Sequence, residues 1–122
     1  MALSPNVTRF IQSSFRSVWS LELLLLLKRE RKPWTQSVIV EALRASQLVV
    51  SQALESLAAA GLVAVGDNAE VQYAPVSEEI AKLIEETEAL YAKRPDAVRR
   101  LIVAASKPGL TAFADAFKLG RD

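Results

Sequence analysis

Apolar residues recur at spacings of three and four along most of the chain, and this period predicts a mainly helical fold. The first such stretch begins at Ser4 and Pro5, a helix-capping residue followed by a proline, and extends to residue 32. Ser13 and Ser14 mark a point where it can divide into two helices. Residues 21–27 are apolar on nearly every side, which predicts the central buried helix. The apolar stripe comprises Val7, Phe10, Ile11, Phe15, Val18, Trp19 and these leucines.

Two shorter helices are expected next. Pro33 ends the first stretch, because the residue before a proline is pushed out of the helical region. Thr35 can cap a helix over residues 36–44, and Ser46 can cap another that extends to about Ala60. Gly61 is placed to close the second of these helices in the left-handed conformation.

A change of pattern after Gly61 predicts a β-hairpin. Residues 62–65 and 70–73 are rich in β-branched residues, and Gly66, Asp67 and Asn68 between them are types that tolerate positive φ. Pro75 ends the second strand.

Three helices are expected in the C-terminal part of the chain. Ser77 and the acidic residues behind it begin a helix that extends to about Lys93, and Pro95 opens the next. The apolar stripe on the first of these helices indicates either packing within the chain or a dimer seam. The last helix must dock on something, because about ten residues form only a marginal helix alone. The candidate interface residues are Ile80, Leu83, Thr87, Leu90, Phe113 and Phe117.

This order of elements is that of a winged helix-turn-helix with additional C-terminal helices. We expect a single domain over residues 1–122, with an N-terminal helix or arm (1–32), a helix-turn-helix and wing (35–76) and C-terminal helices (77–122). Residues 46–63 resemble the recognition helix and following strand of ArsR-like and MarR-like bacterial regulators. Val50, Leu54, Leu57 and Leu62 occupy the positions that are buried in that pattern.

The resemblance implies that the helix over residues 46–60 carries the contact surface. In such domains the exposed side chains near its N-terminal end read bases in the major groove. The corresponding residues, which would contact either DNA or a protein partner, are Gln47, Leu48, Val49, Ser51, Gln52 and Glu55.

Charge argues against a simple DNA reader. No Lys or Arg occurs between residues 45 and 81, and five acidic residues give this segment a charge of −5. Phosphate contacts dominate affinity for DNA, and they require cations. A group of cations elsewhere has two interpretations. It is either a solvent-exposed helix end that complements the helix dipole, or it flanks the helices over residues 36–44 and 46–60 and supplies the phosphate contacts. These residues are Lys28, Arg29, Arg31, Lys32 and Arg44.

Composition excludes several kinds of chemistry. The 122 residues are 51% hydrophobic and 24% charged, with a net charge of +1, which is typical of a folded domain. The chain has no Cys and no His, so we expect no disulfide, no zinc site and no His-based catalysis. The scattered glycines form no phosphate-binding loop. We therefore expect no enzyme, cofactor or metal.

Two hypotheses about function remain open. One is a small cytoplasmic transcriptional regulator, working as a dimer, that binds DNA through the recognition helix. The other is a winged-helix module for protein–protein interaction. The apolar run at residues 21–27 is too short to span a membrane, which needs about 20 apolar residues.

Overall fold

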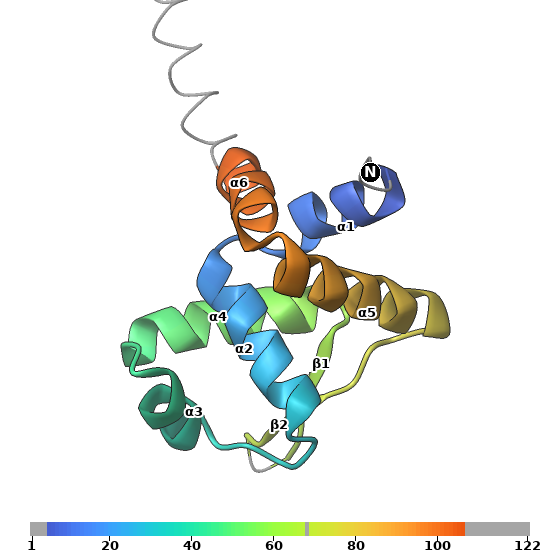
Figure 1. Cartoon of the computed structure of the whole chain (residues 1–122). Helices are drawn as coiled ribbons and strands as arrows, with labels where there is room; N and C mark the ends of the chain where they lie inside the picture. The colour runs from blue at the N-terminus through green and yellow to red at the C-terminus, as the bar shows by residue number, and fades with distance from the viewer. Residues whose placement is uncertain (1–4, 68, 107–122) are drawn as a thin grey trace, which may run out of the picture.

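A computed structural model describes residues 5–67 and 69–106, which form helices and one hairpin (Figure 1). The elements are α1 (Pro5–Ser14), α2 (Val18–Arg29), α3 (Gln36–Leu43), α4 (Gln47–Ala59), β1 (Val63–Val65), β2 (Val71–Tyr73), α5 (Glu78–Lys93) and α6 (Pro95–Ser106). The expectation of a mainly helical chain with a two-stranded antiparallel hairpin is confirmed. The expected helix beyond residue 107 lies outside the described residues, as do Phe113 and Phe117.

The apolar stretch that extends to residue 32 divides into two helices near Ser13 and Ser14, as expected. α1 ends at Ser14, and α2 begins after Ser17, whose side-chain oxygen accepts a hydrogen bond from the Ser20 backbone N–H at 3.2 Å. The Ser20 hydroxyl oxygen in turn accepts a hydrogen bond from the Ser17 backbone N–H, so the two serines form a capping box. This cap fixes where α2 starts and lets it leave α1 at an angle.

α2 passes through the centre of the molecule and divides it into two groups of elements (Figure 1). α1, α5 and α6 contact one another on one side, while α3, α4 and the hairpin lie on the other. Five of the seven residues at 21–27 are less than 2% exposed, which is why α2 needs partners on all sides. All six helices and both strands of the described part contribute residues to the buried core.

Caps at both ends define α4. The Ser46 side chain accepts a hydrogen bond from the Val49 backbone N–H at 3.1 Å. At the other end Gly61 has a φ of +78°, and its N–H and that of Leu62 donate to Ala58 and Leu57 carbonyls at 3.1 and 3.0 Å. This pair of bonds is the Schellman arrangement that glycine favours.

An extended residue joins the helices to the hairpin. Trp34, between α2 and α3, pairs with Val71 of β2 through two backbone hydrogen bonds of 2.9 and 2.7 Å. Its buried indole N–H donates to the Glu30 carbonyl at 2.9 Å. Sequence reasoning missed this bridge. Because Trp34 lies between α2 and α3, these two hydrogen bonds hold the α2–α3 connection against β2 of the hairpin.

The hairpin pairs Val63 with Tyr73 and Val65 with Val71. In the described part of its turn the left-handed residue is Ala69, with a φ of +59°, and neither Gly66 nor Asp67 has a positive φ. The Ala69 N–H donates to the Gly66 carbonyl at 3.0 Å, and this hydrogen bond closes the turn.

Candidate functional site

The outer surface of α4 carries the residues expected to make contacts. Gln47, Leu48, Gln52 and Glu55 are exposed, and Val49 and Ser51 are half-buried. Leu48 stands out, because 66% of a large apolar side chain is accessible. Glu55 is the only charged residue on the helix.

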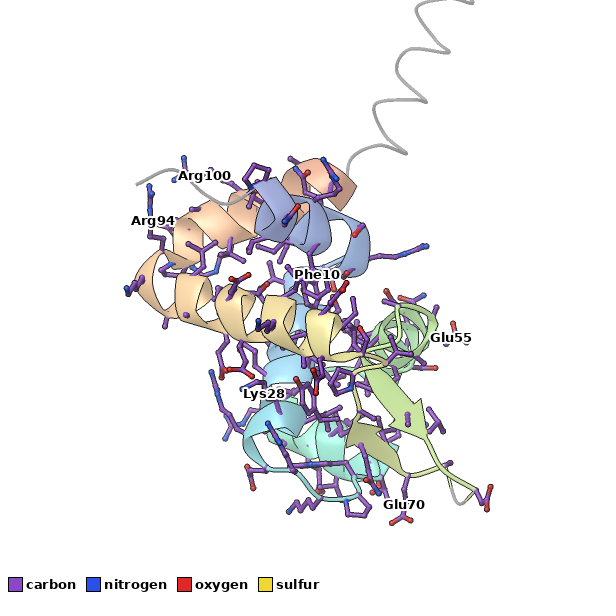
Figure 2. All side chains as sticks on the ribbon, turned by 90° about the vertical axis from the view of Figure 1, so that its right-hand side faces the viewer. Phe10, Lys28, Glu55, Glu70, Arg94 and Arg100 are labelled. Atoms are coloured by element: carbon purple, nitrogen blue, oxygen red, sulfur yellow. The ribbon has the colours of Figure 1, made fainter. Side chains whose placement is uncertain are left out.

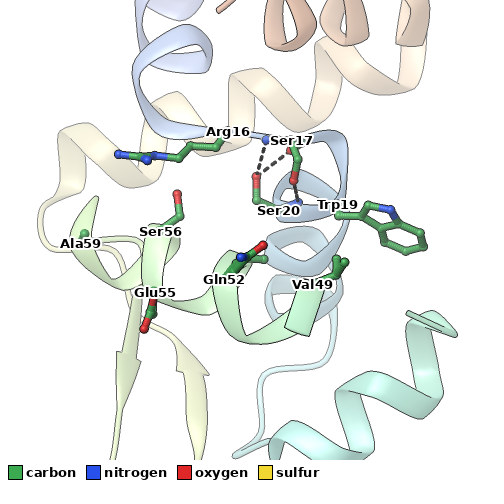
Figure 3. A pocket seen from close by; sticks show the side chains of 10 residues that line it. Arg16, Ser17, Trp19, Ser20, Val49, Gln52, Glu55, Ser56 and Ala59 are labelled. Atoms are coloured by element: carbon green, nitrogen blue, oxygen red, sulfur yellow. Dashed lines mark hydrogen bonds between the residues drawn. The ribbon is translucent and has the colours of Figure 1, made fainter. Parts of the chain in front are cut away.

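A groove lies between α4 and the start of α2, and Figure 3 shows its lining side chains. Its volume is about 550 Å³, within the size range of ligand or peptide sites. The α4 residues that face it recur at spacings of three and four, so they share one side of the helix. The lining residues are Arg16, Ser17, Trp19, Ser20, Val49, Gln52, Ala53, Glu55, Ser56 and Ala59.

The two serines of the groove are already engaged with each other. The Ser20 hydroxyl donates to the Ser17 carbonyl at 2.6 Å, in addition to the capping bond described above (Figure 3). The polar groups left facing the groove are Arg16, Gln52, Glu55 and Ser56. Within the described residues none of these four side chains has a hydrogen bond or ion pair, so they are available to a partner.

Trp19 corrects an expectation about the core. The apolar stripe assigned it to the buried side of the first stretch, but 43% of its side chain is exposed at the rim of the groove. Trp19 lies in the first turn of α2 on the side that faces the groove, while its neighbours Ser20 and Leu21 are buried. Sequence reasoning therefore missed the groove, because four of its ten lining residues come from residues 16–20. The only sequence signal for the groove in residues 16–20 was an Arg and a Trp next to a serine that caps a helix.

At the end of α2, Lys28 and Arg29 are paired with α5 rather than directed toward α4. Figure 2 places Lys28 and Glu55 on opposite sides of the molecule. Lys28 Nζ forms an ion pair with Glu88 Oε1 at 2.8 Å, and Arg29 Nε lies 3.6 Å from the other oxygen. Lys28 is only 15% exposed, so the picture of a solvated helix end is also wrong for this residue.

The remaining cations of that cluster contact aromatic rings. The Arg31 guanidinium lies 5.1 Å from the centre of the Tyr73 ring, and Lys32 Nζ lies 4.5 Å from that of Trp34. Both contacts are cation–π interactions. Arg44 is exposed in a left-handed conformation between α3 and α4, and it is the one member of the cluster adjacent to α4.

Two tyrosines, Tyr91 of α5 and Tyr73 of β2, have raised pKa values. Burial raises the pKa of Tyr91 most, and a hydrogen bond from its hydroxyl to Glu22 Oε2 at 2.5 Å raises it further. Burial also raises the pKa of Tyr73, opposed by Lys28 and Arg31 nearby. Both shifts favour a neutral phenol. Neither tyrosine lines the groove at α4.

The predicted interface along α5 is partly covered within the chain. Thr87 is fully buried and its hydroxyl donates to the Leu83 carbonyl at 2.7 Å, so it cannot belong to a surface seam. Ile80, Leu83 and Leu90 are half-buried and pack against the core. α1 and α6 both contact α5, which accounts for this burial.

The described residues contain neither a candidate metal cluster nor a membrane-spanning helix. They contain no group of three or more His, Cys, Asp and Glu that could hold a metal ion. No helix in ranges 5–67 and 69–106 is long and apolar enough to cross a membrane.

Comparison with known proteins finds no match for this chain among family models, curated proteins or solved structures. Its function must therefore be inferred from its own residues.

Proposed function

We propose that this chain is a winged-helix regulatory module that binds a protein partner through the α4 face. The observation that carries the proposal is an absence of cations combined with exposed apolar side chains. α4 and the hairpin include no Lys or Arg, while Leu48 of α4 and Trp19 beside it stand exposed at 66% and 43%.

The order of elements supports the winged-helix part of the proposal. α2, the extended Trp34, α3, α4, β1 and β2 follow one another as helix, strand position, two helices and two strands. The Gln36 side chain donates to the Gln47 carbonyl at 3.2 Å and braces α3 against the start of α4. In such an arrangement α4 occupies the place of a recognition helix.

Electrostatics disfavour DNA on this face. A protein that neutralises phosphates releases counterions and gains affinity from each Lys or Arg contact. Glu55, Asp67 and Glu70 would instead bring negative charge toward the phosphates. Protein interfaces, by contrast, are enriched in Trp and depleted of charge at their centre.

The groove indicates what kind of partner fits. Trp19 offers an aromatic surface for an apolar anchor, and Arg16 and Glu55 line the same groove with opposite charges. An amphipathic helix or strand with an apolar residue between polar ones would match this lining.

A site-specific crosslinking experiment tests the proposal. Leu48 is replaced by a benzophenone amino acid in the native cells, and Ala92 on α5, which is also exposed, is replaced in the same way as the control. We expect a discrete protein adduct from position 48 that is absent from position 92. Glu55→Lys should weaken this adduct, whereas Glu85→Lys, a matched charge reversal on α5, should leave it unchanged.

Three outcomes would contradict the proposal: no adduct from position 48, a DNA adduct from that position, or the same protein adduct from both positions.

Direct DNA reading by α4 is the second candidate, and Gln47 and Gln52 favour it. Both amides are exposed in the first two turns of α4, and glutamine can pair bidentately with adenine. Selection from a random duplex library separates the candidates. A sequence enriched by the native protein and lost with Gln47→Ala/Gln52→Ala would support DNA reading, whereas no enrichment would contradict it.

A further inference from the structure

Four cations gather where α5 gives way to α6. Lys93, Arg94, Arg99 and Arg100 are all exposed, and Asp96 is the only acidic residue among residues 93–100, which leaves a net charge of +3. We call these four residues the cationic corner. Its charge is opposite to that of the segment from residue 45 to residue 81.

Short-range contacts hold the corner together. Arg94 is the last residue before α6, which begins at Pro95 without an intervening loop. Arg99 Nη1 lies 3.3 Å from Asp96 Oδ1, and its guanidinium lies 5.7 Å from the centre of the Tyr91 ring.

Arg100 is directed the same way, because its Nε donates to the Asp96 carbonyl at 3.4 Å. Both guanidinium groups of α6 therefore fold back toward the junction at Arg94 instead of spreading along the helix.

Helix dipoles account for only part of this cluster. Lys93 and Arg94 lie at the C-terminal end of α5, where a cation is favoured. Arg100 lies in the N-terminal half of α6, where the dipole offers a cation no stabilisation. Asp96 pairs with Arg99 and leaves Lys93, Arg94 and Arg100 without an acidic side-chain partner among the described residues.

We propose that the cationic corner binds the phosphate backbone of a nucleic acid without reading its sequence, with Lys93, Arg94 and Arg100 as the contacts. Arginine forks match phosphate oxygens in two-bond geometry, and a duplex offers a phosphate charge about every 1.7 Å along its axis. A compact cluster of three cations therefore meets several phosphates whatever the register.

Charge separation selects the orientation. Figure 2 shows Arg94 and Arg100 at one end of the molecule and Glu70 of the hairpin region at the other. A polyanion attracts the first end and repels the second, so the hairpin would face away from the nucleic acid. The corner shares no residue with the groove at α4, and the inference stands independently of the proposed docking function.

Fluorescence anisotropy with a mixed-sequence, fluorescein-labelled duplex of about 20 base pairs tests the proposal at about 50 and 200 mM salt. The corner variant Arg94→Gln/Arg100→Gln is compared with Arg16→Gln/Arg44→Gln, which removes the same charge beside α4 from residues that are also exposed. Circular dichroism checks that both variants retain the fold.

Binding by the native protein should weaken with salt, and the corner variant should bind about tenfold or more weakly at the lower salt. Its plot of log affinity against log salt should be shallower by about two, because two phosphate contacts are lost. The variant beside α4 should bind within about twofold of the native protein, since phosphate contacts at the corner remain.

Absence of binding by the native protein at the lower salt would overturn the proposal. So would an equal loss in both variants, which would show that binding follows total charge rather than the corner. Equal affinity for poly-glutamate would assign the corner to an acidic protein instead. The anisotropy results do not depend on the crosslinking experiment at position 48, so either proposal can fail while the other stands.

Discussion

The two sides of α2 use their polar residues in opposite ways. On the side of α5, Glu22 accepts a hydrogen bond from Tyr91 and Lys28 pairs with Glu88, at 2.5 and 2.8 Å. On the side of α4, Arg16 and Glu55 line an open groove, and neither has a hydrogen bond or ion pair within the described residues.

This difference separates groups that hold the fold from groups that are free to bind. A half-buried polar atom without a partner costs free energy, so pairing on the α5 side stabilises the chain. Unpaired polar groups beside an exposed Trp keep their water and can exchange it for a partner. Substitutions on the two sides should therefore affect stability and binding differently.

Leu24→Ala should have the largest effect on stability, because Leu24 is fully buried in the part of α2 that both sides share. We expect the free energy of unfolding to fall by about 2–5 kcal/mol, from lost transfer free energy and the cavity left behind. Chemical denaturation measures this loss. Leu24→Met preserves the volume and should cost less than about 1.5 kcal/mol; a loss as large as that of Leu24→Ala would indicate a packing role beyond volume.

Tyr91→Phe should lower stability by about 1 kcal/mol at neutral pH, because the Glu22 carboxylate loses a hydrogen-bond donor. The pKa of Tyr91 is raised in the folded chain, so the stability from its neutral phenol is fully present below pH 10 and is lost as pH rises through the folded-state pKa. Unfolding at neutral pH and above pH 10 should show a smaller alkaline loss in the variant than in the native chain. An unchanged alkaline loss would mean that Tyr91 does not cause it, leaving Tyr73, whose pKa is also raised.

Glu88→Gln should lower stability by less than about 1 kcal/mol, since partly exposed ion pairs contribute little and salt screens them. The pair with Lys28 is partly shielded, with side-chain exposures of 15% and 26%. A double-mutant cycle with Lys28→Gln measures the coupling, which should decrease as salt is added. Zero coupling would mean that polar pairing does not distinguish the α5 side.

Leu48→Ala should have the smallest effect on stability, within about 0.5 kcal/mol, although the substitution is the same as the one at Leu24. Leu48 is 66% exposed and leaves no cavity when it is shortened. The same denaturation experiment measures it. A loss above about 1 kcal/mol would mean that Leu48 packs within the chain rather than serving a partner.

Local signals made much of the fold predictable. Thr35, Ser46 and Ser77 each accept a backbone N–H at the start of the expected helix, and Gly61 adopts the expected left-handed conformation. Each of these is a contact within a few residues, which a sequence pattern can specify. The hairpin followed from the same kind of signal, although in the described part of the turn Ala69 adopts positive φ and Gly66 and Asp67 do not.

The candidate site was predictable only on the α4 side. The exposed residues of α4 followed from its helical period, but Arg16 and Trp19 reach the groove from a different helix connection. The apolar period of α2 could not show that Trp19, unlike the buried Leu21 in the same turn, is exposed at the groove. Likewise, nothing local to Lys28 predicted Glu88, which lies 60 residues away in the chain.

By itself the sequence determined the helices, their caps, the hairpin and the absence of cations from residues 45–81, because these depend on neighbours in the chain. Only the tertiary structure decided which polar residues are satisfied and which are free. Side chains of α5 engage Lys28 in an ion pair and Glu22 in a hydrogen bond, while the groove beside α4 stays open. Burial and pairing depend on contacts between distant segments, and no local pattern encodes those contacts.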